Sequence, residues 1–313
     1  MNIWNGIEGF PDDRGSVVAT IGNYDGVHVG HRAIVEGVVT EARQRALPSL
    51  LITFEPHPLA VVAPERQPRL LQTRRQKLDS LEQIGLDDVL ILRFDESLAA
   101  LDGSSFFESL LCEHVELAAI HVGETFRFGH RRAGNLELLR NIGVRRGFDV
   151  VGVPAVRLAE ESVSSSAIRA AVEAGDVERA ARLLGRPFTL AGEVVRGDGR
   201  GASLEFPTAN LEVENEIVPA AAVYVSETLA LAGRHPSMTN IGVRPTFGGG
   251  EVRVETHLLD FADDLYGERM ELMLLARIRD EQEFPNPGEL ADQIARDRAA
   301  AEAYFQNLHL RTP

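Results

Sequence analysis

The chain has 313 residues, of which 44% are hydrophobic and 25% charged, and its formal net charge is −15. That length allows two domains, while the acidic balance argues against broad binding to nucleic acid or to an anionic membrane without excluding a local basic pocket. The one cysteine, Cys112, excludes an internal disulfide, and no segment has the pattern of a secretory signal or a membrane span, so we expect a cytoplasmic protein in which Cys112 is a small buried apolar residue.

The first half of the chain alternates strand-like with helix-like segments. Buried strands are predicted at residues 16–22, 49–54, 88–94, 118–123 and 148–156. Apolar residues at helical spacing predict a helix around Ile34, Val38 and Ala42 and helices at 72–85, 106–115 and 134–147, with Ser105 and Glu108 as a capping box. This alternation predicts a doubly wound parallel sheet, whose ligands bind outside the carboxyl ends of the strands.

The pattern changes near Gly185. Two short helices are predicted at 164–175 and 176–185. They are followed by β-rich runs at 189–197, 222–231, 252–261 and 270–278 with no helix between them, and by an amphipathic helix from Pro287 to Leu308. Such a series predicts a small antiparallel barrel or sheet with a terminal helix. We therefore divide the chain into an α/β domain, 1–186, and a β domain, 187–313.

The loop after the first strand, GNYDGVHVGH (22–31), is the first candidate site. It leads into a helix, whose free N–H groups and positive dipole end attract phosphate. His28 and His31 add two donors able to neutralise charge on a phosphate oxygen, and the glycines allow close backbone approach. A metal pair or two core histidines are the alternatives, although a metal site requires a third ligand that the neighbouring sequence does not offer.

A second cluster, VSSSAIR (163–169), has the composition of a helix start that binds phosphate. Its serine hydroxyls and cap N–H groups precede Arg169, which lies one turn into the predicted helix. Hydroxyls, N–H groups and a guanidinium all suit a polyphosphate. Serine-rich caps are common in helices of every function, so capping alone remains the alternative here.

Several motifs occur in an order that resembles the prokaryotic bifunctional riboflavin kinase/FAD synthetases. IGNYDGVHVGHRAIV (21–35), TFEPHP (53–58), VGETFRFGHRRAGN (122–135) and VSSSAIR resemble the adenylyltransferase half. FPTANL (206–211), NIGVRPTF (240–247), VETHLLDF (254–261), DLYG (264–267) and RDEQEF (279–284) resemble the kinase half. The resemblance covers nearly the whole chain and implies a Rossmann-like nucleotidyltransferase domain before the β-barrel.

The resemblance implies that FMN attacks the α-phosphorus of ATP beside His28 and His31, which act as the catalytic residues, and that FAD and pyrophosphate leave. The implied nucleotide-binding residues of this half are Gly22, Asn23, Asp25, Gly26, Gly30, Ser164, Ser165 and Arg169. His57 and the loop residues Thr125, Phe126 and Phe128 are implied to bind the flavin. A capping role is the alternative for His57.

FPTAN lies at the centre of the kinase half. Thr208 and Asn210 offer a hydroxyl and an amide oxygen, which are hard ligands for a Mg²⁺ that bridges nucleotide phosphates. The preceding GDGRG loop, through Gly197, Gly199 and Gly201, is suited to wrap phosphates with backbone N–H groups. Glu255 aligns with the family's catalytic base, which takes the proton of the riboflavin 5′-hydroxyl as that oxygen attacks the γ-phosphorus of ATP.

The implied substrates are riboflavin, FMN and ATP, with Mg²⁺ as cofactor and FAD as product, and no nucleic-acid or membrane partner. The chain departs from the family's usual pattern at Thr125, Ala202, Glu205 and Ala222. Glu205 adds charge and bulk beside the expected polyphosphate site. Two alternatives therefore stay open: an FAD synthetase with a weak or silent kinase domain, and a non-catalytic flavin-binding regulator.

Overall fold

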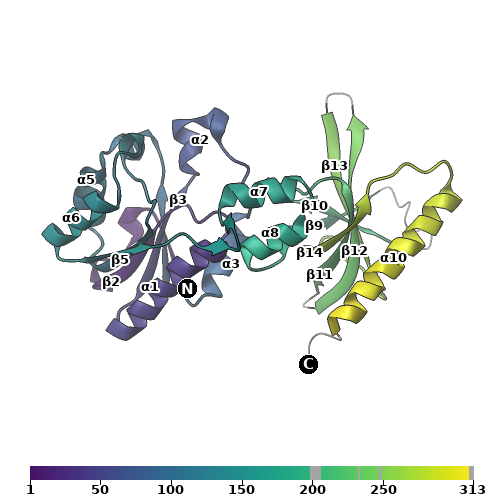
Figure 1. Ribbon diagram of the computed structural model, residues 1–313, viewed down its shortest axis with the longest axis horizontal. Coiled ribbons are helices and arrows are strands. Elements are labelled where there is room, and N and C mark those ends of the chain that lie inside the picture. Colours follow the sequence, from purple (N-terminus) through teal and green to yellow (C-terminus); the bar gives the residue numbers. More distant parts are fainter. Residues whose placement is uncertain (198–205, 232, 247–248, 310–313) are drawn as a thin grey trace. The chain divides into compact units, whose positions relative to one another are not determined.

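The structure is a computed structural model that describes residues 1–197, 206–231, 233–246 and 249–309. The chain divides into two compact units, Met1–Ser164 and Ser165–Pro313 (Figure 1). Each unit has its own sheet and its own buried hydrophobic clusters. The domain division after residue 186, which follows from sequence pattern, stays a prediction.

A six-stranded parallel sheet forms the first unit, in the order β1-β4-β3-β2-β5-β6. The strands are β1 (Asn2–Asn5), β2 (Val17–Ile21), β3 (Ser49–Glu55), β4 (Asp88–Arg93), β5 (Leu117–Gly123) and β6 (Asp149–Val153). From β2 the chain steps to β3 and β4 on one side, and then returns to β5 on the other. The predicted doubly wound sheet is confirmed, and its switch point, where ligands bind in such sheets, lies between β2 and β5.

Helices cover both faces of this sheet. They are α1 (Val29–Arg45), α2 (Pro58–Val62), α3 (Arg74–Glu82), α4 (Glu96–Ala100), α5 (Gly103–Ser105), the π-helix η4 (Phe106–Leu111) and α6 (Leu136–Arg146). One-turn 3-10 helices lie at Ile7–Gly9, Asp12–Arg14, Pro64–Arg66 and His130–Arg132, and a small hairpin joins β7 (Arg157–Leu158) to β8 (Glu161–Ser162). Val35 of α1 and Leu81 of α3 pack with Leu51 on one face.

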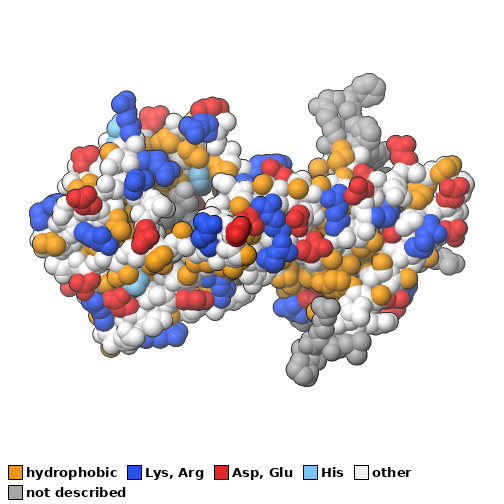
Figure 2. Space-filling view, in the orientation of Figure 1, with side chains coloured by type: hydrophobic (Ala, Val, Ile, Leu, Met, Phe, Trp, Pro, Cys, Tyr) orange, Lys and Arg blue, Asp and Glu red, His pale blue; other side chains and the backbone are white. Residues whose placement is uncertain are grey.

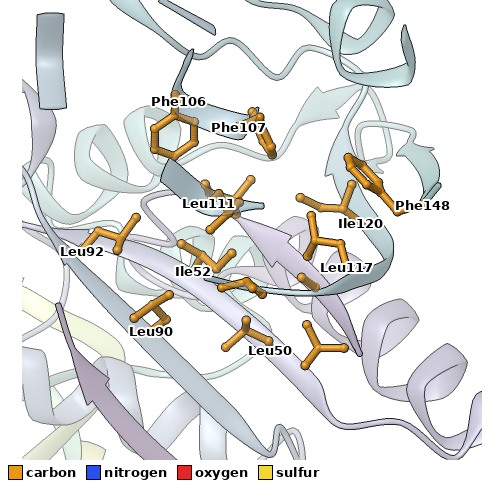
Figure 3. Packing of buried hydrophobic residues seen from close by; sticks show 14 of the residues in the cluster. Leu50, Ile52, Leu90, Leu92, Phe106, Phe107, Leu111, Leu117, Ile120 and Phe148 are labelled. Carbon is orange, nitrogen blue, oxygen red and sulfur yellow. The ribbon is translucent and has the colours of Figure 1, made fainter. Parts of the chain in front are cut away.

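The larger cluster covers the other face of the sheet and explains why its strands are almost wholly apolar. Leu50, Ile52, Leu90 and Leu92 of β3 and β4 lie in this cluster with Phe106, Phe107 and Leu111 of η4 (Figure 3). Leu139 and Ile142 of α6 belong to the same cluster. Parallel strands buried on both faces have continuous rather than alternating hydrophobic sequence, as SLLITF does. The segment after β4 differs from its prediction, because Asp102 rather than Ser105 caps it.

Asp102 accepts hydrogen bonds from the N–H and the hydroxyl of Ser105, at 3.0 and 2.8 Å. The expected capping box of Ser105 with Glu108 is therefore wrong, and the helix starts three residues earlier and continues as a π-helix. Cys112 directly follows this π-helix and is half-buried rather than fully buried. Burial raises the pKa of its thiol, so the thiolate form is disfavoured there.

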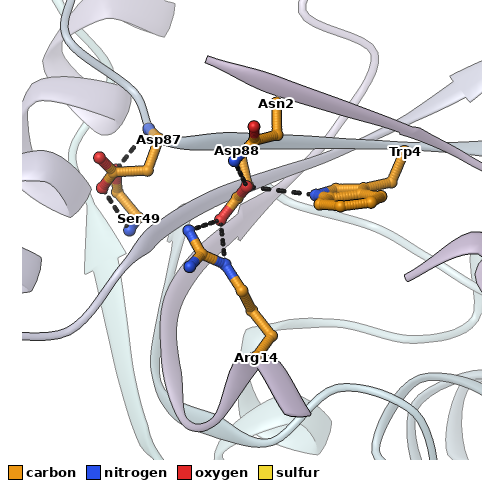
Figure 4. Close-up of polar contacts among 6 residues, drawn as sticks. All are labelled: Asn2, Trp4, Arg14, Ser49, Asp87 and Asp88. Atoms are coloured by element: carbon orange, nitrogen blue, oxygen red, sulfur yellow. Dashed lines mark hydrogen bonds and ion pairs between the residues drawn. The ribbon is translucent and has the colours of Figure 1, made fainter. Parts of the chain in front are cut away.

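The buried carboxylate of Asp88 fixes the N-terminal segment to the sheet (Figure 4). Asp88 is fully buried and accepts hydrogen bonds from Asn2 (2.9 Å) and Trp4 (3.2 Å) of β1 and from the Nε of Arg14 (2.7 Å). Arg14 also contacts it through a second guanidinium nitrogen at 2.5 Å. A buried charge needs such partners, so Asp88 specifies both β1 and the turn that precedes β2.

The second unit contains a closed barrel in the strand order β10-β13-β12-β11-β14-β9. The strands are β9 (Phe188–Val195), β10 (Ala209–Val213), β11 (Ala222–Ala230), β12 (Gly233–Thr246), β13 (Gly249–Leu258) and β14 (Arg269–Asp280). All neighbouring strands are antiparallel. The helices are α7 (Ser165–Glu173), α8 (Val177–Leu184) and α10 (Pro287–His309), so the predicted barrel with its terminal helix is confirmed.

Hydroxyl side chains fill one part of the barrel interior. Ser226 on β11 lies 2.8 Å from Ser237 and 2.7 Å from Thr239, both on β12, and Thr239 contacts Thr256 on β13. These four side chains are fully buried. Because each hydroxyl has a hydroxyl partner, the network avoids the cost of unsatisfied polar groups in a core.

The helix α10 is attached to the barrel through both apolar and charged contacts. Phe305 and Ala301 of α10 pack against Val225 and Met238. The guanidinium of Arg279 on β14 reaches the buried carboxylate of Asp297, with contacts of 3.0 and 2.7 Å.

Charged side chains of both signs are interspersed on the face shown in Figure 2. Within the described residues, no helix combines the length and apolar character that a membrane span requires.

Candidate functional sites

The first site is built where β2 ends and α1 begins. His28 is the N-cap of α1, because its Nδ1 accepts a hydrogen bond from the backbone N–H of His31 at 3.1 Å. A neutral imidazole that accepts at Nδ1 carries its proton on Nε2. The cap therefore fixes the tautomer of His28 and makes its Nε2–H a donor. Gly30 leaves room for this arrangement, since a Cβ there would lie 3.3 Å from the His28 ring.

His31 stacks on His28, with ring centroids 3.5 Å apart and ring planes 16° apart. Its Nδ1 is buried and has no hydrogen-bond partner among the residues that the structure describes. Burial first, and then the neighbouring His28 and Lys77, hold the pKa of His31 well below its usual range. The ring is therefore neutral at physiological pH, and an anion bound beside it would raise that pKa.

The loop between β2 and His28 is buried and held in an unusual backbone conformation. Tyr24 and Val27 have positive φ angles of 51° and 38°, and both side chains are buried. Positive φ is rare for residues other than glycine, especially for a β-branched one. The Tyr24 hydroxyl contacts Thr20, and its ring lies 4.9 Å from the ring of His31. Through Tyr24, the loop therefore packs against the histidine pair from the side of the sheet.

The remaining loop residues also lie at this edge of the sheet. Asp25 is buried and accepts a hydrogen bond from the Leu71 N–H at 2.9 Å. Gly22 directly follows β2, and Gly26 has a φ of 88° that disfavours any residue with a side chain. The sequence predicts that these residues bind the nucleotide. The contacts seen in the structure show how they determine the shape of the loop.

His57 lies beside the same loop and has the capping role that was the alternative considered from sequence. It caps α2, since its Nδ1 accepts from the Leu59 N–H at 3.2 Å. Its Nε2 lies 3.1 Å from the side-chain amide of Asn23. The capping role is therefore observed, and the contact with Asn23 brings the ring to the edge of the first site.

Lys77 is a residue of this site that sequence reasoning missed. Its ammonium, on α3, donates to the Asn23 carbonyl and to the Thr53 hydroxyl, both at 2.7 Å. Burial lowers its pKa to about 8, against the opposite pull of Glu55 and Asp25. Helical periodicity predicts an amphipathic helix at 72–85, but nothing in one sequence indicates that a lysine of α3 reaches the loop after β2.

The loop after β5 holds the predicted flavin residues in three different environments. Thr125 is exposed, Phe126 is half-buried, and Phe128 is buried in the larger core cluster. The rings of Phe126 and Phe128 stack 5.4 Å apart, and Phe128 also packs against Phe107 at 4.8 Å. Phe128 therefore supports this loop from below, and Thr125 and Phe126 form its accessible part.

The segment that leads to the serine cluster passes close to the histidine turn. A Cβ at Gly30 would lie 3.9 Å from Val156, whose carbonyl accepts a hydrogen bond from the Val163 N–H. Ser164 is the last residue of the first unit, while Ser165 and Arg169 belong to α7 in the second unit. All three make interactions within the protein.

The second site lies on one face of the barrel wall. Glu255 on β13 is directly opposite Asn210 on β10 and Asn240 on β12. Residues directly opposite in antiparallel strands share a face, and neighbouring residues of a strand point to opposite faces. Thr256 faces the barrel interior, so Glu255 and the two asparagines lie on the outside, where all three are partly exposed.

Gly197 lies against Asn210 so closely that a Cβ would be 2.2 Å from the amide nitrogen. No residue except glycine fits there without movement of the backbone. The other predicted phosphate-loop glycines, Gly199 and Gly201, lie outside the described residues, as do Ala202 and Glu205. Ala222, the third departure in this half, is fully buried at the start of β11.

The donor set of the second site fits Mg²⁺. Asn210 of β10 is directly opposite Glu255, and Thr208 immediately precedes β10, so a hydroxyl, an amide oxygen and a carboxylate are available there. Within the described residues, no three His, Cys, Asp or Glu side chains are grouped as ligands for a metal. In the part of the chain that the structure describes, His28 and His31 therefore belong to no group of three such side chains.

Two protein families match this chain in the order expected from its sequence. The FAD synthetase family matches residues 10–167, and the riboflavin kinase family matches residues 184–305. A solved structure described as a macrolide-efflux protein from Streptococcus pneumoniae superposes with a TM-score of 0.89 at 28% identity, over 96% of this chain and 99% of its own. The similarity therefore extends over residues of both units.

Relatives cover nearly the full length as well. The bifunctional riboflavin kinase/FMN adenylyltransferase of Escherichia coli strain K12 is 42% identical over 289 residues, 92% of each chain. The enzyme of the same name from Pseudomonas fluorescens is 38% identical over 304 residues, 97% of each chain. The resemblance found in the sequence is confirmed: the chain belongs to the bifunctional riboflavin kinase/FMN adenylyltransferase family and contains both enzymatic domains.

Proposed function

We propose that the stacked pair His28 and His31 is the phosphate centre of FMN adenylylation in this enzyme. A phosphate oxygen of FMN attacks the α-phosphorus of ATP. The bond from that phosphorus to the bridging oxygen breaks, and FAD and pyrophosphate are formed. The reaction needs no covalent intermediate with the protein, so catalysis comes from positioning and from stabilisation of the charge that builds on the phosphate oxygens.

The two histidines have different tasks in this proposal. His28, whose tautomer is fixed by the α1 cap, donates from Nε2 to a phosphate oxygen. His31 is neutral before ATP binds and becomes a stronger donor as the bound polyphosphate raises its pKa. The N–H groups at the start of α1, together with the positive end of the helix dipole, also attract the phosphates.

The other residues of the first site support this pair. We assign Gly22, Asn23, Asp25, Gly26 and Gly30 to the shape of the nucleotide loop, and Lys77 to its attachment. His57, Thr125 and Phe126 are proposed to contact the flavin, with Phe128 beneath them. The assignment of Ser164, Ser165 and Arg169 to the leaving pyrophosphate rests on their residue types and on the family resemblance.

For the kinase reaction we propose Glu255 as the general base. Its carboxylate takes the proton of the ribityl 5′-hydroxyl as that oxygen attacks the γ-phosphorus, and ADP leaves. The position of Glu255 between Asn210 and Asn240 supports this role. Gly197, Gly199 and Gly201 are proposed to wrap the phosphates of the nucleotide.

Thr208 and Asn210 are proposed to hold the Mg²⁺ of the nucleotide. When bound, the ion neutralises phosphate charge and orients the phosphates. Hydroxyl and amide oxygens are ligands that Mg²⁺ prefers, and the glycine at 197 lets the backbone approach Asn210. We also propose a cytoplasmic location, which the single cysteine supports, and small molecules rather than nucleic acids as partners, which the acidic net charge supports.

The first assignment rests on the buried Nδ1 of His31 at the switch point of the sheet, which has no hydrogen-bond partner in the described part of the chain. The test uses the purified chain with ATP, Mg²⁺ and either riboflavin or FMN, and chromatography follows both products. His31→Gln should stop FAD formation and leave FMN formation, while Glu255→Gln should do the reverse. A variant that folds but loses both activities would contradict the assignment of the two reactions to separate sites.

A further inference from the structure

His257, on β13, lies two residues after Glu255 and therefore on the same face of the strand. It is only 6% exposed. Its Nδ1 lies 2.8 Å from the Pro207 carbonyl, and its ring meets that of Phe206 edge to face at 5.7 Å. Since a carbonyl only accepts, Nδ1 carries the proton and donates it. One side chain thus holds the two residues that precede Thr208.

This bond leaves the second ring nitrogen as an acceptor. In a neutral imidazole with its proton on Nδ1, Nε2 has a lone pair and no hydrogen. The Nε2 atom is buried and has no hydrogen-bond partner among the described residues. Buried polar atoms without partners are rare and destabilising, so this acceptor needs an explanation.

The contacts of His257 named here, all within the described residues, supply no donor for Nε2. Met238 is its cross-strand partner on β12 and has no hydrogen to donate from its side chain. Pro207 has no N–H, and Phe206 presents an apolar ring. An atom that accepts, is buried and lies on the face of Glu255 is suited to a hydroxyl-bearing ligand. Riboflavin brings such hydroxyls to this face when its ribityl 5′-hydroxyl meets Glu255.

We propose that His257 is a positioning residue of the riboflavin kinase site, with one task for each ring nitrogen. Nδ1–H fixes the Phe206–Pro207 segment and so places Thr208 for the nucleotide. Nε2 accepts a hydrogen bond from a ribityl hydroxyl of riboflavin and so orients the chain that ends at Glu255. The inference rests on the proposed location of the kinase centre around Thr208, Asn210 and Glu255.

Two substitutions separate the two tasks. In His257→Asn the amide nitrogen takes the place of Nδ1 and continues to donate to Pro207, while the acceptor at Nε2 is lost. We expect the KM for riboflavin to rise about tenfold, as for one lost hydrogen bond, with the KM for Mg·ATP within about twofold of wild type. His257→Leu removes both nitrogens, so both KM values should rise and kcat should fall at least about tenfold.

The matched control is His235→Leu on β12. His235 is a second barrel histidine, packed edge to face on Phe261 at 4.8 Å, and its loss should change neither KM. FAD formation from supplied FMN measures whether each variant keeps its first unit active, and far-UV circular dichroism measures whether the barrel is folded. A folded His257→Asn protein with unchanged KM for riboflavin would overturn the ligand role of Nε2. Unchanged kinetics in a folded His257→Leu protein would overturn the positioning role as well.

Glu255→Gln distinguishes a failure of this inference from a failure of the proposed site. If Glu255→Gln abolishes FMN formation while both His257 variants behave as wild type, only the role of His257 is wrong. If Glu255→Gln leaves FMN formation intact, the kinase centre lies elsewhere and the inference about His257 falls with it.

Discussion

The imidazoles of His28 and His31 are stacked, with their centroids 3.5 Å apart and their planes 16° apart. Two rings at this distance cannot both be positively charged imidazolium ions without strong repulsion. One of them, His28, is fixed by its cap as a donor. The other is kept neutral by burial and by its neighbours, and it is therefore the ring whose charge depends on what binds.

Binding of a non-hydrolysable ATP analogue should be accompanied by proton uptake. His31 starts with a pKa well below its usual range, and the triphosphate raises that pKa, so protons are taken up near neutral pH. Calorimetry in two buffers with different ionisation enthalpies measures the uptake. His31→Gln should remove it, and equal uptake in this variant would show that another group titrates.

His31→Gln should lower the rate of FMN adenylylation by roughly 10²–10³-fold, which is the usual effect of removing one donor to a transition-state oxygen. The rate of riboflavin phosphorylation should not change. The two rates are measured separately, with FMN or with riboflavin as substrate. A decrease of less than threefold would remove His31 from the catalytic role.

Glu255→Gln should lower riboflavin phosphorylation by roughly 10²–10⁴-fold, because it removes the proposed general base while keeping the side-chain shape. Adenylylation of added FMN should persist. Glu212→Gln, which changes an exposed carboxylate on β10, is the matched control and should retain the wild-type rate. Equal losses in the two variants would indicate a general effect of charge rather than base catalysis.

Lys77→Met should change how stability depends on pH. The pKa of Lys77 is about 8 in the folded protein, lowered from 10.5. Between these values the unfolded chain binds more protons than the folded one, so this group makes the protein more stable as pH rises. Urea unfolding at pH 7 and pH 9.5 measures the free energy of unfolding. Between these pH values, that of wild type should rise relative to that of Lys77→Met by up to about 1.4 kcal/mol per pH unit. If the free energy of unfolding had the same pH dependence in the two proteins, the lowered pKa of Lys77 would be contradicted.

Asp88→Ala should destabilise the first unit by about 3–5 kcal/mol, because it leaves the Arg14 charge without its buried partner. Glu36→Gln breaks the exposed pair of Arg32 and Glu36 on α1 and should cost less than about 1 kcal/mol. Chemical unfolding, followed by the fluorescence of Trp4, measures both changes. A similar loss in the free energy of unfolding for the two variants would mean that the buried pair of Asp88 and Arg14 is no more stabilising than an exposed one.

The first site could be located from sequence because its position follows from topology. Once strands and helices alternate, the loops after the strands meet at one edge, and His28 and His31 lie in such a loop. Lys77 could not be found in this way. Its role depends on how α3 packs against the sheet, and that is decided by contacts between residues far apart in the chain.

The barrel was predicted less completely than the sheet. The barrel strands β9, β11, β13 and β14 follow the predicted runs, but β10 and β12 were not assigned as strands. β12 contains Pro236 and Pro245, which lower any expectation of a strand, and β10 has only five residues. Closure of the barrel also depends on pairings such as Asn210 with Glu255, which no local pattern encodes. The error at Ser105 has a simpler reason: Asp102 is an equally good cap three residues earlier, and the helix starts there.

The hydroxyl network of Ser226, Ser237, Thr239 and Thr256 has a consequence for how the barrel avoids misassembly. A shift of one residue between strands turns every side chain to the opposite face. If β13 paired one residue out of place, Glu255 would enter the core and the hydroxyl of Thr256 would lose its partner. Such a slipped barrel would bury a charge and break a satisfied network at once. The same alternation that places the Glu255 carboxylate outside the core therefore penalises the competing fold, so that an assembled barrel is also one whose proposed base faces outward.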